Sequence, residues 1–95
     1  MQNEVTITNE ARATNAWTKG KATCNGHHYD FQIKHFDEGS EFGIMKGRIS
    51  KLWMREEGAE DAVLNYDRGW ERGRSPKGKA AEVVAIYKAI LAKFN

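Results

Sequence analysis

The stretch F-D-E-G-S-E-F-G-I-M-K-G-R-I-S-K-L-W, Phe36–Trp53, decides the fold, because it joins one clear strand to the strand that pairs with it. Its early part, Asp37–Glu41, holds three acids, a glycine and a serine, a composition typical of a loop. The following segment, Phe42–Arg55, is apolar and basic and predicts a long strand. Gly47 interrupts this strand, either as a β-bulge or as the second residue of a tight turn with Lys46. The bulge is the preferred interpretation, because it keeps one long strand paired with its predecessor.

The position of Gly47 also determines which residues of this strand are buried. Side chains alternate between the two faces of a strand, so a shift of one residue changes the whole buried set. The shift exchanges Ile49 and Trp53 for Leu52 and Met54 in the core. Both registers remain open at this point.

Two strands precede this stretch. Trp17–Cys24 is interpreted as a strand with the faces W-K-K-T and T-G-A-C, weakened or bulged at Gly20. Asn25-Gly26 predicts a type I′ turn, because both residue types tolerate positive φ. The segment His27–Phe36 predicts a strand with one buried side. Its two faces are Tyr29, Phe31, Ile33 and His35 on one side and His28, Asp30, Gln32 and Lys34 on the other.

After the stretch, the chain is expected to return to the sheet and then to cover it. Glu56–Asp61 is an acidic loop, Ala62–Tyr66 a short fourth strand, and Asp67–Gly78 a linker rich in glycine and arginine. Ser75-Pro76 predicts a helix start, with serine as N-cap and proline at the first helical position. The helix is expected to end near Phe94. Its apolar stripe consists of Ala80, Val83, Val84, Tyr87, Ile90, Leu91 and Phe94.

The predicted fold is α+β, an antiparallel meander sheet of three to four strands with one C-terminal helix packed on one face. The length of 95 residues indicates one domain, a ββββα unit over residues 16–95. Residues 1–15 are expected to be a tail that either frays or forms a strand at Val5–Thr8. The second face of the sheet is left to water or to a partner.

Cys24 is the only cysteine, which excludes an intrachain disulfide and fits a reducing compartment. The first residues lack a cationic and then apolar pattern, so we expect no signal peptide. No apolar run approaches the length of a membrane span. These features predict a cytoplasmic soluble protein without a membrane partner. The net charge of +2 names no partner by itself.

Three motifs carry a resemblance to a known family: F-D-E-G-S-E-F-G-I at 36–44, G-R-I-S-K-L at 47–52 and N-Y-D-R-G-W at 65–70. They are similar to motifs of a family of small uncharacterised domains associated with phage and mobile-element genes of Gram-positive bacteria. The resemblance covers residues 17–94. That family has no established activity, so no catalytic or binding residue is implied. The implied context is an accessory protein that acts on a host or phage factor.

Cations cluster in the basic loop Arg68–Lys79, where five basic residues accompany one acid. Tryptophan and arginine often dominate protein interfaces, and rings beside cations also suit stacking on unpaired bases. The first hypothesis is therefore a non-enzymatic protein-interaction module. The alternative is nucleic-acid binding by the same surface, the exposed sheet face and the basic loop. The opposing interpretation is a solvated loop whose tryptophans point into the core. The candidate partner-binding residues are Arg48, Lys51, Trp53, Arg68, Trp70, Arg72 and Arg74.

The sequence argues against a metal centre or a catalytic site. The acids of Asp37–Glu41 lack the alternate spacing of a calcium loop. Cys24 and His27 face each other across the predicted turn, but zinc needs about four ligands. No third group that would orient this pair for nucleophilic catalysis is apparent. We expect no metal, no cofactor and no enzymatic activity, unless a cleft holds Cys24, His27 and an acid together.

Overall fold

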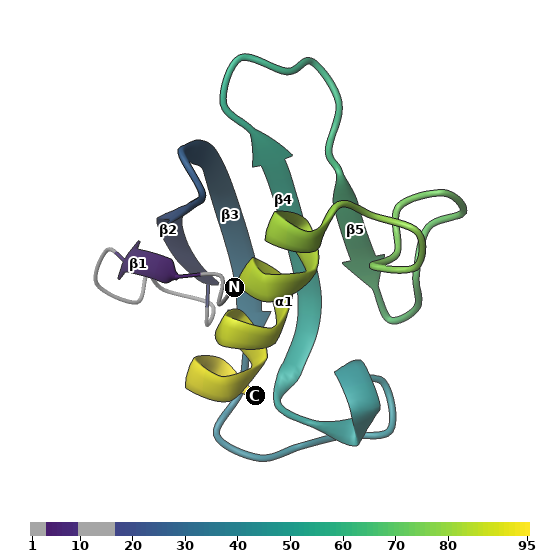
Figure 1. The fold of residues 1–95 in the computed structure, drawn as a ribbon. Helices are drawn as coiled ribbons and strands as arrows, with labels where there is room; N and C mark the ends of the chain where they lie inside the picture. Colours follow the sequence, from purple (N-terminus) through teal and green to yellow (C-terminus); the bar gives the residue numbers. More distant parts are fainter. Residues whose placement is uncertain (1–3, 10–16) are drawn as a thin grey trace.

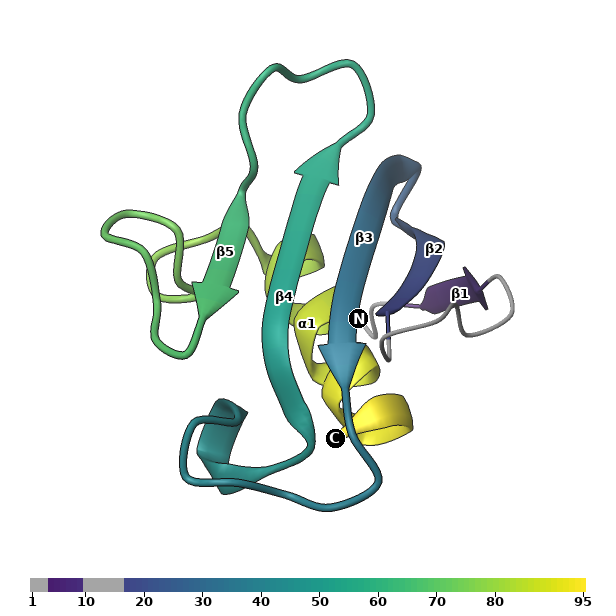
Figure 2. The same ribbon diagram turned by 180° about the vertical axis from the view of Figure 1, so that it is seen from behind.

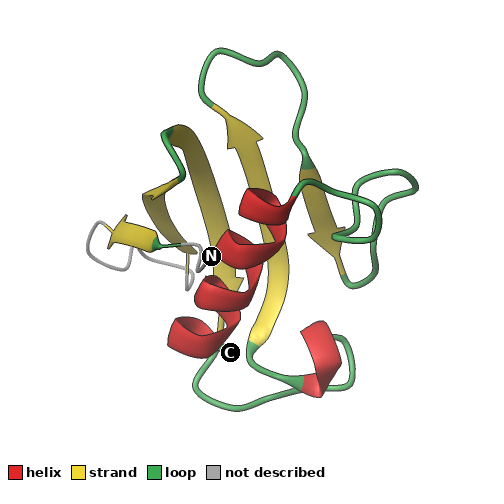
Figure 3. Ribbon diagram, in the orientation of Figure 1, coloured by secondary structure: helices red, strands yellow, loops and turns green. Residues whose placement is uncertain are grey.

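The computed structural model describes residues 4–9 and 17–95. They form a five-stranded antiparallel sheet in which the strands follow chain order, with one α-helix across one face (Figures 1 and 3). The elements are β1 (Val5–Asn9), β2 (Trp17–Cys24), β3 (His27–His35), the 3₁₀ helix η2 (Ile44–Lys46), β4 (Ile49–Glu56), β5 (Leu64–Asp67) and α1 (Ala81–Phe94). The predicted α+β class, meander and C-terminal helix are confirmed. The predicted number of three to four strands is wrong.

The fifth strand comes from the N-terminal segment. β1 pairs antiparallel with β2, with Val5 opposite Cys24. Val5 and Ile7 pack against the core, and this burial gives the short segment a reason to dock. Of the two alternatives for the tail, the strand at Val5–Thr8 is the one present. Residues 10–15 of that tail lie outside the described residues.

β2 and β3 form the hairpin that Asn25-Gly26 predicts. Asn25 has φ 52° and Gly26 has φ 80°, the left-handed conformations that a type I′ turn requires. Strand alternation then places Tyr29, Phe31 and Ile33 in the core, as expected. This hairpin is the part of the fold that local sequence determines most directly.

The segment between β3 and β4 is a loop, so the predicted long strand Phe42–Arg55 is wrong. β4 begins at Ile49, so the residues before it do not pair with β3 as a strand. Within η2, Met45 has φ 50° and Lys46 has φ 59°. Two consecutive left-handed residues reverse the chain, and extended pairing cannot continue through them. Gly47 closes this turn with a 2.8 Å hydrogen bond from its N–H back to the start of η2.

A β-bulge is present in β4, but at Ser50 rather than at Gly47. The pairing of β3 with β4 shifts there, and Ser50 is the extra residue. Alternation is therefore offset on the two sides of the bulge. Ile49 before the bulge and Leu52 and Met54 after it all reach the core. Of the four residues that the two alternative registers would bury, only Trp53 lies on the opposite face.

α1 begins at Ala81, several residues after the predicted start at Ser75-Pro76. Gly78 has φ 76°, and the N–H of Lys79 donates to the Pro76 carbonyl oxygen at 3.2 Å. This closed turn is incompatible with a helix at those positions. The predicted end at Phe94 is confirmed.

The helix packs an apolar stripe on the sheet. Ile86 is fully buried although the predicted stripe lacks it, and Ala80, which the prediction included, is exposed because it precedes the helix. The buried residues of α1 are Val83, Ile86, Tyr87, Ile90 and Phe94. The predicted fourth strand is displaced toward the C-terminus, since β5 spans Leu64–Asp67.

Candidate binding surface

The sheet face opposite α1 is called the open face, because none of the described elements crosses it (Figure 2). The antiparallel register brings alternate residues of all five strands onto it. They are Thr6, Thr8, Trp17, Lys19, Lys21, Thr23, His28, Asp30, Gln32, Lys34, Lys51, Trp53, Arg55, Asn65 and Asp67. This face is polar and aromatic, whereas the face under α1 is apolar.

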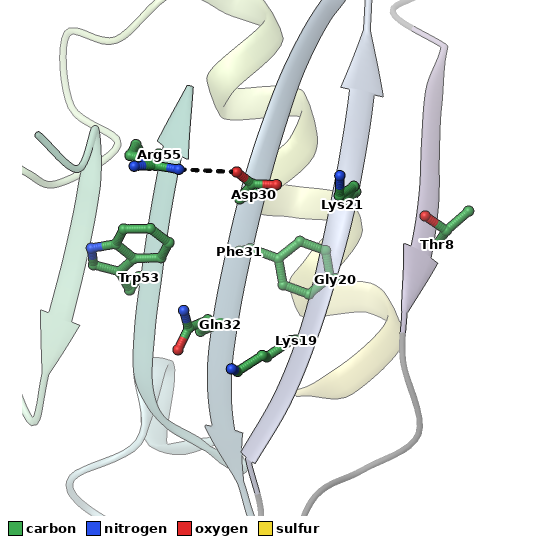
Figure 4. A pocket seen from close by; sticks show the side chains of 9 residues that line it. All are labelled: Thr8, Lys19, Gly20, Lys21, Asp30, Phe31, Gln32, Trp53 and Arg55. Carbon is green, nitrogen blue, oxygen red and sulfur yellow. Dashed lines mark hydrogen bonds and ion pairs between the residues drawn. The ribbon is translucent and has the colours of Figure 1, made fainter. Parts of the chain in front are cut away.

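The open face is basic, with five cations against two acids. Both acids are already paired: Lys51 Nζ lies 3.6 Å from Asp67 Oδ1, and Arg55 Nη2 lies 3.3 Å from Asp30 Oδ2 (Figure 4). Exposed ion pairs of this kind contribute about 0–1 kcal/mol each. Their main effect here is to neutralise both acids of the face.

Three lysines of the open face form no ion pair with an acid of residues 4–9 or 17–95. Lys19 and Lys21 project from β2, and Lys34 from β3. Lys34 Nζ lies 5.7 Å from the centroid of the Phe36 ring, a cation–π contact that leaves its charge uncompensated. The open face therefore carries an excess of positive charge that is concentrated on β2 and β3.

Trp53 stands near the middle of the open face and separates two hollows. The first, called the lysine hollow, has a volume of about 380 Å³ and is lined by Lys19, Lys21, Arg55 and Trp53 among others. Figure 4 shows Trp53 and Arg55 on β4 and the two lysines on β2, with β3 between them and Lys19 extending from β2 towards β3. Phe31 and Asp30 also line it, and the three cations outnumber the single acid, so this recess suits an anionic group.

The second hollow, called the tryptophan hollow, lies on the other side of Trp53. It has a volume of about 410 Å³, and Trp17 and Trp53 both line it. Asn65 and Lys51 add polar groups. Both tryptophans are half-buried, so their rings are held by the sheet while part of each remains accessible. Two such rings suit a flat ligand.

Gln32 lines both hollows. It lies opposite Lys19 on β2 and opposite Trp53 on β4. Its carboxamide carries two N–H donors and one acceptor, so it can bind either end of a polar ligand that crosses from one hollow to the other.

The structure separates the candidate residues that the sequence suggested. Lys51 and Trp53 lie on the open face. Arg48 is half-buried in the loop before β4. Arg68 is exposed at the end of β5, with φ 60°, and its guanidinium lies 5.6 Å from the centroid of the Phe42 ring.

Most of the basic loop has a structural role. The ring of Trp70 lies between those of Tyr66 and Tyr87, at centroid distances of 5.0 and 5.6 Å, on the α1 side of the sheet. Arg74 donates to the Ala62 carbonyl oxygen and pairs with Glu71 at 3.4 Å. These contacts fold the loop back on β5.

Three cations of the basic loop, Arg68, Arg72 and Lys77, stay exposed on its surface. The interpretation that the tryptophans point into the core thus holds for Trp70 and fails for Trp53. The basic loop and the open face are two separate groups of cations rather than one surface.

Sequence reasoning missed the contribution of β2. Trp17, Lys19 and Lys21 form one face of that strand, the W-K-K-T alternation, yet none was named as a candidate. The available indication was that a strand followed by a tight hairpin must put its polar side next to the polar side of β3. The other face of β2, T-G-A-C, is not clearly apolar, so the polar face of this strand was not recognised from the sequence.

The environment of Cys24 and His27 does include acids. His27 Nδ1 lies 3.3 Å from Glu56 Oε2, and His27 Nε2 lies 3.6 Å from Glu82 Oε1. Cys24 is fully buried, and this desolvation, followed by the negative charge of Glu82, raises the pKa of its thiol. A reactive cysteine needs the opposite shift and an accessible sulfur. Cys24 is therefore part of the hydrophobic core, whereas His27 and Glu56 are exposed at the surface.

Among residues 4–9 and 17–95, no group of three or more His, Cys, Asp or Glu side chains is arranged to hold a metal ion. The acids of the Asp37–Glu41 loop are exposed. No helix in the described part of the chain has the length and apolar character needed to cross a bilayer.

Comparison with known families gives one match. The family model of a domain of unknown function, DUF7678, matches residues 16–95. The chain therefore belongs to this family, which agrees with the resemblance to small uncharacterised domains. No curated protein and no solved structure is significantly similar to the chain.

Proposed function

We propose that this DUF7678 domain is a non-enzymatic binding module whose open face takes single-stranded nucleic acid. The observation that carries the proposal is Trp53, which stands half-buried between the two hollows on a face with unpaired lysines. Proteins that bind single strands combine a cationic surface that follows the backbone with aromatic rings on which bases stack. The open face supplies both.

Charge favours the open face over the basic loop as the binding site for nucleic acid. Lys19, Lys21 and Lys34 are paired with no acid in the described part of the chain, so they can neutralise phosphates without first breaking an ion pair there. In the basic loop, Arg74 is committed to structural contacts. A ligand there meets Arg68, Arg72 and Lys77, and the half-buried Trp70 of this loop is already packed against Tyr66 and Tyr87.

The other candidate function is binding of an acidic segment of a partner protein on the same face. The observation that favours it is the presence of tryptophan beside arginine, since Arg55 lies 5.7 Å from the ring of Trp53. Such pairs often anchor protein interfaces. The two candidates differ in salt dependence, because a polypeptide releases far fewer counterions than a polyphosphate.

The test is fluorescence anisotropy with labelled single-stranded DNA, single-stranded RNA and the matching duplex, across a salt series. We expect single strands to bind more tightly than the duplex, whose bases are not free to stack. Affinity should fall linearly in log salt with a slope of roughly −2, about 0.7 for each of three lysines. No binding at low salt, or a salt-insensitive complex, would exclude nucleic acid.

Two charge-reversal variants locate the site. Lys19→Glu/Lys21→Glu should reduce affinity by about a hundredfold or more, because two phosphate contacts become repulsive. Arg72→Glu/Lys77→Glu changes the net charge by the same amount in the basic loop and should have a much smaller effect. An equal loss in both variants would move the site away from the open face. The ring contribution is measured in the same way, with Trp53→Ala against Phe42→Ala, an exposed ring off the open face.

The cellular context is also a proposal. The motifs at 36–44, 47–52 and 65–70 resemble those of phage and mobile-element domains, and the single cysteine fits a reducing cytoplasm. An accessory protein that acts on single strands produced during replication or transfer would suit that setting. The genes that flank members of the family provide the check: a majority in chromosomal regions without phage or mobile-element genes would contradict it.

A further inference from the structure

The two hollows of the open face differ in chemistry although they share a wall. The lysine hollow gathers Lys19, Lys21 and Arg55. The tryptophan hollow is bounded by Trp17 and Trp53. Gln32 and Trp53 line both, so any ligand that fills the two hollows must pass over these two residues.

We infer that the open face divides each bound nucleotide between these hollows, with phosphate in the lysine hollow and base in the tryptophan hollow. This inference rests on the proposed function and assigns separate roles within it. It makes Trp17, which the sequence did not suggest, a base-stacking residue, and Lys19 and Lys21 phosphate-binding residues.

Electrostatics assigns the phosphate. Each hollow contains one neutralised pair: Arg55 with Asp30 at 3.3 Å in the lysine hollow, and Lys51 with Asp67 at 3.6 Å in the tryptophan hollow. The lysine hollow adds Lys19 and Lys21, which pair with no acid among the described residues. A phosphate in the tryptophan hollow would meet only the neutralised pair. The lysine hollow is therefore the anion site.

Ring geometry assigns the base. Trp17 on β2 and Trp53 on β4 lie on either side of β3, two interstrand spacings apart and offset by two residues along the strands, which corresponds to about 12 Å between their backbones. A planar base can stack on one ring and touch the other, and both rings are only half-buried. Asn65 and Gln32 place carboxamides along the same hollow, where they can donate to and accept from a base edge.

Gln32 connects the two parts. In the register it stands between Lys19 and Trp53, which belong to the anion side and the aromatic side respectively. A nucleotide with its phosphate beside Lys19 and its base against Trp53 therefore passes its sugar over the Gln32 carboxamide. This order, lysine, glutamine, tryptophan across three neighbouring strands, is the feature that distinguishes the arrangement from a general basic patch.

The experiment compares a normal single-stranded oligonucleotide with an abasic oligonucleotide of the same length, which keeps the phosphates and lacks the bases. Both are titrated across a salt series against the full chain and its variants. We expect the abasic strand to bind more weakly but with the same salt slope. Trp17→Ala should weaken the normal strand about tenfold and leave the abasic strand unchanged. Trp17→Leu keeps an apolar side chain against the sheet and is the second variant, used if Trp17→Ala does not fold. It should weaken the normal strand and leave the abasic strand unchanged in the same way.

Lys19→Ala and Lys21→Ala should act on both oligonucleotides equally. Each should reduce the magnitude of the salt slope by about 0.7, the value for one phosphate contact on a single strand. An equal loss for the two strands with Trp17→Ala, or an unchanged slope with the lysine variants, would overturn the division of roles while leaving nucleic-acid binding in place. Failure of both strands to bind at low salt would instead overturn the proposed function itself.

Discussion

At the scale of single residues, Gly20 shows how one missing side chain shapes the sheet. It lies opposite Phe31 on β3. A Cβ at Gly20 would lie 2.7 Å from Phe31 Cε2 and 2.7 Å from the Thr8 carbonyl oxygen. The Phe31 ring therefore packs over the glycine, in the space that a side chain would occupy. What looked like a weak point of the strand is a position where a ring needs room.

Gly20→Ala is expected to destabilise the protein by about 1–3 kcal/mol, because the added methyl must displace a core ring and a backbone atom. The measurement is urea unfolding followed by circular dichroism. Gly69→Ala is the matched control, since a Cβ there meets no atom within 4 Å and should change stability by less than about 0.5 kcal/mol. Equal stability of the two variants would show that Phe31 adjusts freely.

The residue scale also shows where sequence reasoning about the site succeeds. Lys51 and Trp53 were both named as candidates from their residue types, but the sequence left the register of their strand open, and the bulge at Ser50 is what places them on the open face. Trp70 could not, because it lies in a segment without periodicity and its two aromatic neighbours come from β5 and α1. Local composition does not reveal contacts between residues that are distant in the chain.

At the scale of elements, the end of α1 holds the loop between β3 and β4. The Asn95 side chain accepts the N–H of Ile49 at 2.9 Å and donates to the Ile44 carbonyl oxygen at 3.1 Å. Its own backbone N–H caps the helix on Leu91. One carboxamide therefore joins the helix end, η2 and the start of β4. Gly47 permits this contact, because a side chain there would occupy the position of the Asn95 amide.

Asn95→Ala should cost about 1–3 kcal/mol, since it leaves the Ile49 N–H and the Ile44 carbonyl without these partners. Asn95→Asp keeps the acceptor for the Ile49 N–H and loses the donor to Ile44. Its stability should therefore lie between that of the wild type and that of Asn95→Ala. Hydrogen exchange provides the second measurement, with faster exchange expected at Ile49 in the alanine variant. Unchanged exchange there would show that the loop is held by its own turns.

Element boundaries were predicted well where a local rule applies and poorly where a distant contact decides. The hairpin at Asn25-Gly26 follows from backbone preference alone. The start of α1 was misplaced, because Ser75-Pro76 is a good local signal that the turn at Gly78 overrides. The long strand predicted through Gly47 failed for a related reason, since Asn95, from the other end of the chain, stabilises a turn there.

At the scale of the whole molecule, the sheet has one apolar face sealed by α1 and one polar face that the described elements leave uncovered (Figures 1 and 2). The α+β class followed from the order of the predicted elements. The sheet size did not, because β1 gains its stability by docking on β2. The open face as a surface, with β2 contributing Trp17 and two lysines, required the register of all five strands.

Cys24 offers a probe of the whole fold. It is fully buried between the sheet and α1, and burial raises the pKa of its thiol. Reaction with a thiol reagent at pH 8 should be slower than in the unfolded chain by about a thousandfold or more, and urea should accelerate it as global stability falls. The control is Cys24→Ala/Thr23→Cys, which moves the thiol to the open face and should react at once. Rapid labelling of Cys24 without urea would show that the β2–β3 hairpin opens locally.

The position of α1 in the chain has a consequence for synthesis. Each strand pairs with the strand made just before it, so the sheet can assemble stepwise as the polypeptide leaves the ribosome. The helix that covers its apolar face follows all five strands in the chain, at residues 81–94. Until that segment emerges, Phe31, Ile33 and Leu52 have no cover. During that interval the apolar face of the nascent sheet is exposed and prone to aggregation.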